Sequence, residues 1–241
     1  MGSRERSELR ERLRNSESTE DKWLILGNEV QKLIRKEAKI KEGNMLDVTS
    51  FVNLRVNPMF RFFGEILSEA YTKKYGPDYI TNVLTVKSSG NIFAGNTGFE
   101  LYKYTIIGQK GIPKILEGEE LYSSEAESYT GGEKYNIIIP KSFIEEGDII
   151  FIADDFIATG SSTFALLEMI INQAHAKLAG IAALITKDYK GQEGYKILGE
   201  FVKEYNLNHK NKASLNTLVR ITDMSTTIEN IKYGKSPLRL N

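Results

Sequence analysis

The sequence predicts an α/β protein with a doubly wound, mainly parallel sheet, in a single domain of about 200 residues plus appendages. Two observations support that prediction. Short apolar runs, each of a length suited to a buried strand, alternate along the 241-residue chain with segments of helical periodicity. The clearest run, residues 149–153, ends in two adjacent carboxylates and leads through a turn of small residues into an amphipathic helix.

The expected helices and strands follow in chain order. Apolar residues spaced from Trp23 to Ile34 mark a first helix, and Asn57-Pro58 opens a second, with Asn as N-cap and Pro at the first position. Further on, apolar runs predict strands and the periodic segments between them predict helices. The predicted strands cover residues 83–86, 104–107, 137–139, 149–153, 181–187 and 218–221, and the later helices end at Leu101 or span 161–176 and 192–205.

Two segments lack such a pattern. Residues 1–20 are dense in Arg, Glu and Ser, and Leu9 and Leu13 are their only apolar side chains beyond Met1. We therefore expect a charged, disordered extension there, followed by one folded domain over residues 21–241. Residues 109–135 have no clean period, which in a compact domain is typical of a functional or mobile segment.

Composition excludes several classes of protein. Lys plus Arg and Asp plus Glu both number 32, so the chain has no net charge with which to attract nucleic acid or an anionic membrane. It has no cysteine and two histidines, which excludes thiolate chemistry and disfavours a histidine-rich metal site. The apolar runs are too short to cross a bilayer, and no apolar segment follows the N-terminal arginines. We expect a cytoplasmic protein without a nucleic-acid or membrane partner.

The most informative stretch follows the apolar run 149–153. Asp154 and Asp155 end that run, and the small residues of 158–163 (Ala-Thr-Gly-Ser-Ser-Thr) precede the next helix. A small-residue turn that opens a helix is typical of a phosphate-binding loop, because backbone N–H groups and hydroxyls point at one anion. Paired carboxylates suit a polyol, so phosphate plus diol indicates a ribose 5-phosphate. The alternative is an ordinary buried strand, turn and helix, but an acidic pair at a strand end is costly unless it is used.

This stretch resembles the signature of type I phosphoribosyltransferases that binds phosphoribosyl pyrophosphate (PRPP). The resemblance is closest to bacterial xanthine phosphoribosyltransferases and runs from about residue 28 to 232, with further matches at 47–58, 85–90 and 185–189. It implies that Asp154 and Asp155 hold the ribose and, directly or through water, Mg²⁺. It also implies a set of PRPP-binding residues: Ala158, Thr159, Gly160, Ser161, Ser162, Thr163, Lys87, Ser88, Ser89, Gly90 and Lys110.

The base is expected to meet Asn53, Lys187 and Phe156, carried over from the same resemblance. A lysine only donates hydrogen bonds, so Lys187 suits the carbonyl of a 6-oxopurine and mismatches the amino group of adenine. Ala158 stands where hypoxanthine-guanine enzymes have an aspartate, a candidate general base. The lack of an aspartate at this position favours xanthine, which loses a ring proton more easily than hypoxanthine or guanine. Adenine enzymes, however, also have alanine there.

The resemblance therefore implies a purine phosphoribosyltransferase that uses xanthine, or a related 6-oxopurine, with PRPP and Mg²⁺. It implies a homodimer, with a small hood built from residues 21–57 and the C-terminal stretch. Two departures leave alternatives open. Lys87 stands where the xanthine enzymes usually have glutamate, and the basic cluster after residue 107 is thinned to Lys110 and Lys114. An adenine phosphoribosyltransferase and a non-catalytic PRPP- or purine-sensing regulator remain the alternatives.

Overall fold

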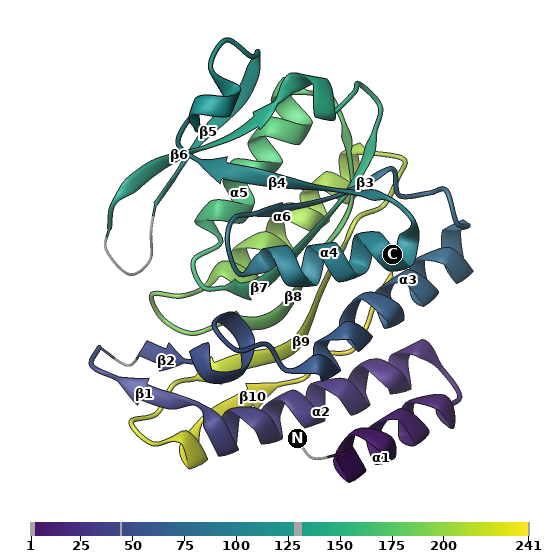
Figure 1. Cartoon of the computed structure of the whole chain (residues 1–241), viewed down its shortest axis with the longest axis vertical. Helices are drawn as coiled ribbons and strands as arrows, with labels where there is room; N and C mark the ends of the chain where they lie inside the picture. Colours follow the sequence, from purple (N-terminus) through teal and green to yellow (C-terminus); the bar gives the residue numbers. More distant parts are fainter. Residues whose placement is uncertain (1–2, 44, 128–131, 241) are drawn as a thin grey trace.

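A computed structural model describes residues 3–43, 45–127 and 132–240 of the chain. Its centre is an eight-stranded sheet in the order β10-β9-β8-β7-β3-β4-β6-β5. The inner strands from β9 to β4 are parallel, and antiparallel strands flank them at both edges (Figure 1). The strands are β3 (Asn82–Val86), β4 (Tyr104–Lys110), β5 (Leu121–Glu127), β6 (Lys134–Pro140), β7 (Ile149–Ile157), β8 (Lys177–Lys187), β9 (Ser214–Asp223) and β10 (Lys232–Gly234).

Helices cover both faces of this sheet, as the alternating sequence predicts. Along β7, Phe151 and Ala153 pack into a core with the helices of one face, whereas Ile150 and Ile152 pack into a core with those of the other. The first face is covered by α2 (Thr19–Glu37), α3 (Arg61–Tyr75) and α4 (Gly90–Leu101), and the second by α5 (Ser161–Leu167) and α6 (Gly194–Asn208). The doubly wound, mainly parallel α/β fold is therefore confirmed. None of the helices in the described residues is long and apolar enough to cross a membrane.

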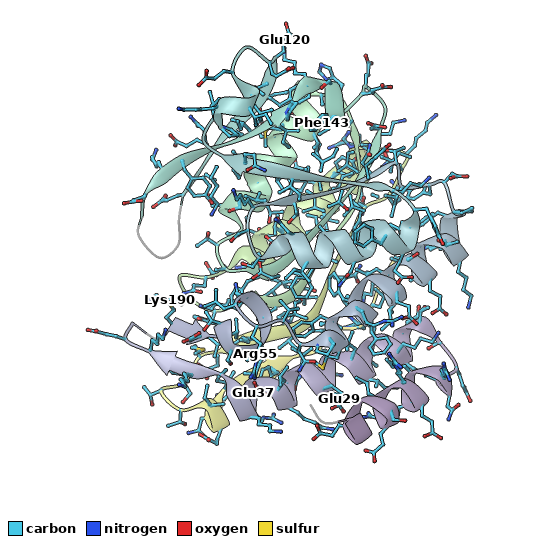
Figure 2. All side chains as sticks on the ribbon, viewed as in Figure 1. Glu29, Glu37, Arg55, Glu120, Phe143 and Lys190 are labelled. Carbon is cyan, nitrogen blue, oxygen red and sulfur yellow. The ribbon has the colours of Figure 1, made fainter. Side chains whose placement is uncertain are left out.

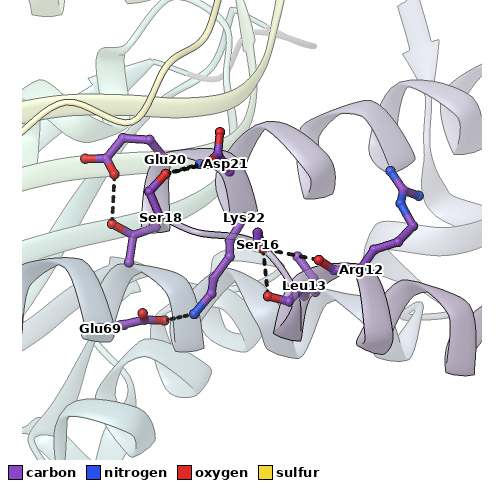
Figure 3. Close-up of polar contacts among 9 residues, drawn as sticks. Arg12, Leu13, Ser16, Ser18, Glu20, Asp21, Lys22 and Glu69 are labelled. Carbon is purple, nitrogen blue, oxygen red and sulfur yellow. Dashed lines mark hydrogen bonds and ion pairs between the residues drawn. The ribbon is translucent and has the colours of Figure 1, made fainter.

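The N-terminal segment differs from the disordered extension expected from its charge. Residues Ser3–Arg14 form a helix, α1, and its two leucines are buried, with Leu9 2% and Leu13 5% exposed. Spaced four residues apart, they lie on one face of the helix and join the core that α2 and α3 form. Ser16 Oγ donates to the Leu13 carbonyl and Ser18 accepts from the Asp21 N–H, which closes α1 and caps α2 (Figure 3).

The segment that lacks a period contains a strand that its sequence pattern did not indicate. β5 pairs with β6 in an antiparallel hairpin, from Leu121 opposite Pro140 to Glu127 opposite Lys134. β5 is the outermost strand, and Ala126 is its one fully buried residue, so its sequence carries almost no apolar alternation. The helix expected over 161–176 is likewise shorter: α5 ends at Leu167 and a π-helical stretch, Glu168–Gln173, follows.

A separate small unit precedes α3. The strands β1 (Lys39–Lys41) and β2 (Met45–Asp47) form a two-stranded sheet, and a π-helical turn, Thr49–Asn53, follows it (Figure 1). Asn57 then accepts a hydrogen bond from the Met59 N–H at 3.1 Å, which is the N-cap that the sequence predicts for the second helix. That helix starts with a 3₁₀ turn, Pro58–Phe60, before α3.

Candidate active site

The candidate site forms where β7 ends, between β3 and β8 in the middle of the sheet. The backbone N–H of Asp155 donates to Asp154 Oδ1 at 2.9 Å, which fixes the Asp154 carboxylate beside its neighbour. Burial and the adjacent Asp155 carboxylate raise the pKa of Asp154 well above its usual value, and Lys110 opposes that rise. Asp155 itself is 7% exposed. With Asp155 buried and Asp154 half-buried, the pair is a largely enclosed acidic centre that favours a cation or a hydroxyl-rich ligand.

The small-residue turn lies directly beyond this pair. Gly160 has φ +84°, a left-handed conformation that suits glycine, and it is the residue immediately before α5. The turn lines a pocket of about 190 Å³ together with Asp154, Phe156 and Lys110. The structure thus brings all of Ala158–Thr163 together with two acids, Asp154 and Glu127, two aromatic rings, Phe156 and Tyr135, and one lysine.

The β5–β6 hairpin completes this pocket, which sequence reasoning missed. Tyr135 OH and Ser162 Oγ share a hydrogen bond of 2.8 Å, and the Glu127 N–H donates to Ser161 Oγ at 2.8 Å. The Lys110 ammonium lies 4.6 Å from the centre of the Tyr135 ring, a cation–π contact that holds the lysine at the pocket. No sequence pattern ties residues 127 and 135 to a loop that lies more than 25 residues further along the chain.

Gly194, the first residue of α6, is a second residue that sequence reasoning missed. Its N–H donates to the Ala158 carbonyl at 2.9 Å, and a Cβ there would lie 2.5 Å from that oxygen and 2.8 Å from the Gly160 nitrogen. A side chain at this position cannot fit without moving the turn. The start of α6 therefore fixes the backbone of the small-residue turn from behind.

Residues 87–90 join β3 to α4 beside the acids. A Cβ on Gly90 would lie 2.4 Å from both Asp154 Oδ1 and Thr85 Oγ1, so glycine allows the start of α4 to approach the acidic pair. Lys87 is exposed, its N–H donates to the Gly108 carbonyl at 2.9 Å, and the Lys87–Ser88 peptide bond is cis. Ser89 and Gly90 thus lie close to the acids, whereas the Lys87 side chain faces solvent.

The three expected base residues lie around the same strand ends. Asn53 Nδ2 donates to Ser89 Oγ at 2.7 Å and to Asp155 Oδ2 at 3.1 Å. Lys187 is 2% exposed, and its ammonium lies 5.3 Å from the centre of the Phe156 ring on the neighbouring strand. A second ring, that of Tyr189, lies 6.0 Å away and was not singled out from the sequence. Burial lowers the pKa of Lys187 to about 8.

No family model matches the chain. The chain is 30% identical over 165 residues to xanthine phosphoribosyltransferase 1 of Clostridium perfringens, across 68% of this chain and 84% of that protein. It is 32% identical over 169 residues to the xanthine phosphoribosyltransferase of Oenococcus oeni, across 70% and 79% of the two chains.

Solved structures show the same fold. An adenine phosphoribosyltransferase from Thermoanaerobacter pseudethanolicus superimposes with a TM-score of 0.57 at 20% identity, over 80% of this chain and 98% of that one. The enzyme from Trypanosoma brucei, solved with AMP, pyrophosphate and ribose-5-phosphate, gives a TM-score of 0.60 at 14% identity over 78% of each chain. At these identities the likeness establishes the fold alone.

Proposed function

The chain belongs to the type I phosphoribosyltransferase family, and on that premise we propose that it transfers the phosphoribosyl group of PRPP to a 6-oxopurine, with xanthine preferred. In that reaction the bond from ribose C1 to pyrophosphate breaks, and a bond from C1 to a purine nitrogen forms. The observation that supports the proposal is one group of residues at the end of β7. Asp154 of the acidic pair and the small-residue loop line one pocket there. The Phe156 ring lines the same pocket and lies against the buried Lys187 ammonium.

We assign the PRPP side of the site first. The turn Ala158–Thr163 holds the 5-phosphate through backbone N–H groups and hydroxyls, helped by the positive charge of Lys110. Asp154 and Asp155 accept hydrogen bonds from the ribose hydroxyls. Ser88, Ser89 and Gly90 hold the pyrophosphate, with Lys87 able to reach it from the solvent side.

The acidic pair also fits Mg²⁺, which usually takes one or two protein carboxylates and completes its shell with water and substrate phosphates. Burial and, after it, the adjacent Asp155 carboxylate raise the pKa of Asp154, and a divalent cation beside the pair would favour the ionised form. Asp154 and Asp155 would hold the ion, directly or through water. Bound there, Mg²⁺ would neutralise charge on the departing pyrophosphate.

The base side rests on Lys187. With a pKa of about 8 it is mainly protonated at neutral pH, so it donates to the 6-oxo group, and the Phe156 ring offers a flat apolar surface beside it. Adenine presents an amino group there, which cannot accept a hydrogen bond from the lysine ammonium. Ala158 supplies no carboxylate to remove a ring proton, which favours the purine that ionises most easily. We propose that β1, β2, the turn Thr49–Asn53 and β10 form the hood that closes over this base.

The test is pyrophosphate release from PRPP with xanthine, hypoxanthine, guanine and adenine in turn. We expect xanthine to give the highest kcat/KM and adenine the lowest. Lys187→Ala should lower kcat/KM for xanthine by about 10- to 100-fold, the loss expected for one buried hydrogen bond to a charged donor, while PRPP affinity is retained. Adenine as the best substrate would replace this proposal with the adenine enzyme. PRPP binding without turnover on any purine would replace it with the regulator.

A further inference from the structure

Asn53 joins two parts of the site that are far apart in the sequence. Its side chain extends from the turn Thr49–Asn53 and uses both amide N–H groups, one toward Ser89 Oγ at 2.7 Å and one toward Asp155 Oδ2 at 3.1 Å. One partner belongs to the loop before α4, and the other is the acid at the end of β7. A single amide therefore ties the small N-terminal unit to both halves of the proposed PRPP site.

The chemistry of its partners sets the orientation of this amide. An ionised carboxylate only accepts hydrogen bonds, so the group that faces Asp155 must be the NH₂ and not the carbonyl. Asn53 Oδ1 then points away from both partners. It is buried and has no hydrogen-bond partner among the described residues. A buried acceptor in that state calls for a donor from outside the chain.

The turn that carries Asn53 is held without this side chain. Asp47 accepts from the Thr49 N–H at 3.0 Å and pairs with Lys41 at 2.7 Å, and these bonds hold the pKa of Asp47 well below its usual value. At the other end, Arg55 donates to the Ser50 carbonyl and to Glu37, both at 2.9 Å; Figure 2 labels this Arg55–Glu37 pair. The bonds of Asn53 are therefore additional to those that shape the turn.

We propose that Asn53 is a positioning residue that couples the PRPP subsite to the base subsite, an inference that rests on the proposed function. By donating to Ser89 Oγ, it leaves the Ser89 O–H available to donate to a pyrophosphate oxygen. By donating to one oxygen of Asp155, it leaves the other to accept a ribose hydroxyl. Its own Oδ1 accepts a ring N–H of the purine. Base affinity then depends on whether PRPP has ordered Ser89 and Asp155.

The first experiment measures PRPP binding by calorimetry without any base. Asn53→Ala should weaken PRPP about tenfold, since two hydrogen bonds to PRPP-binding residues are lost. Asn57→Ala is the matched control, because Asn57 lies in the same stretch and caps the Pro58–Phe60 turn. It should lower the melting temperature and leave PRPP affinity unchanged. Equal PRPP affinity in Asn53→Ala and wild type would overturn the proposal.

An isosteric variant separates positioning from packing. Asn53→Asp keeps the volume of the side chain, but when ionised it cannot donate and it faces the Asp155 carboxylate. A packing role predicts that Asn53→Asp binds PRPP like wild type, whereas the positioning role predicts binding weaker than that of Asn53→Ala. The first result would overturn the proposal.

The second experiment measures coupling between the two subsites. Xanthine binding is compared with and without ribose 5-phosphate plus pyrophosphate, a pair that cannot transfer the ribosyl group to the base as PRPP does. Wild type should bind xanthine several-fold more tightly in their presence, and Asn53→Ala should lose most of that gain. An undiminished gain in Asn53→Ala overturns the coupling. If wild-type protein binds PRPP but releases no pyrophosphate with any purine, the proposed function fails, and the base-free PRPP measurement still decides whether Asn53 positions Ser89 and Asp155.

Discussion

The charge of Lys187 is buried in the site, and burying it has a cost in free energy. The side chain is 2% exposed, and its ammonium lies against the rings of Phe156 and Tyr189. Burial disfavours the charged form, which is why the pKa falls from 10.5 to about 8. The cation–π contacts recover part of this cost. A charge held in this way is ready to bind a carbonyl oxygen that enters the site.

The cost of burying the Lys187 charge predicts how the stability of the fold depends on pH. Below about pH 8 both the folded and unfolded states hold the proton, so the full penalty is present. Between about pH 8 and 10.5 the unfolded state binds more protons, and this contribution to stability rises with pH. We therefore expect Lys187→Met to raise the melting temperature at pH 7, with a gain that shrinks as the pH approaches 10.5.

Thermal unfolding of both proteins across that range provides the measurement, with Lys196→Met, at an exposed position of α6, as the control. A loss of stability in Lys187→Met that is the same at pH 7 and pH 10 would contradict the prediction.

Some site residues could be predicted from the sequence and others could not, and the difference has a physical reason. The acidic pair and the turn Ala158–Thr163 are contiguous, so their chemistry can be read from one stretch. Tyr135 and Glu127 reach the turn only because an edge hairpin folds over it. Such contacts depend on tertiary packing and leave no local pattern.

At the level of elements, the inner strands were predictable because both faces of a parallel strand are buried and the sequence is apolar throughout. In β8 all residues after Lys177 are buried. β5 was not predictable, since one edge and much of both faces are exposed and polar residues are tolerated there. The helix α1 was not predicted because the segment is densely charged and its two leucines, although they lie on one face of the helix, are too few to indicate a buried face.

The contact between α6 and the small-residue turn predicts a selective mutation. Gly194→Ala places a Cβ 2.5 Å from the Ala158 carbonyl oxygen, so the turn must shift and the phosphate-binding N–H groups move with it. We expect PRPP to bind at least tenfold more weakly, with a smaller effect on stability.

Gly199→Ala on the same helix is the matched control, because its Cβ would meet only a Leu215 methyl group at 3.8 Å. Alanine favours helix by about 1 kcal/mol over glycine, so that variant should be neutral or more stable. If PRPP affinity falls equally in both variants, the contact between Gly194 and the small-residue turn is not the cause of the loss.

For the molecule as a whole, α1 adds a layer beyond α2 and α3 (Figure 1). Leu13→Ala should lower stability by about 2 kcal/mol, the low end for a buried leucine, because an outer helix can relax around the gap. For a chain of this size that corresponds to a melting temperature lower by roughly 4–8 °C. Glu11→Ala, at an exposed position of α1, is the control. Unchanged melting of Leu13→Ala would support the expectation of an undocked extension.

The second prediction for the whole molecule is its assembly. The family resemblance implies a homodimer, and three strongly exposed aromatic side chains line one shallow depression at the end of α4 and the start of β4. They are Phe99, Tyr102 and Tyr104, which are 77%, 94% and 85% exposed. Aromatic side chains are enriched at interfaces. We expect sedimentation at micromolar concentration to give twice the chain mass of 27.2 kDa, and a single species of 27.2 kDa would contradict this.

Gly90 and Gly194 restrict how this sequence can diverge in evolution. Each lies where a side chain would strike atoms of another segment, Asp154 and Thr85 in one case and the turn before α5 in the other. Replacing Gly90 requires the Asp154 and Thr85 side chains to move, and replacing Gly194 requires the backbone of the turn before α5 to move, so either single change distorts the site. Gly95 also lies on α4, but a Cβ added there would have no neighbouring atom within 4 Å, so substitutions at this position should be tolerated. Among descendants of this protein, substitutions should therefore accumulate at Gly95 and Gly199 long before they appear at Gly90 and Gly194, which lie one to two turns away on the same helices.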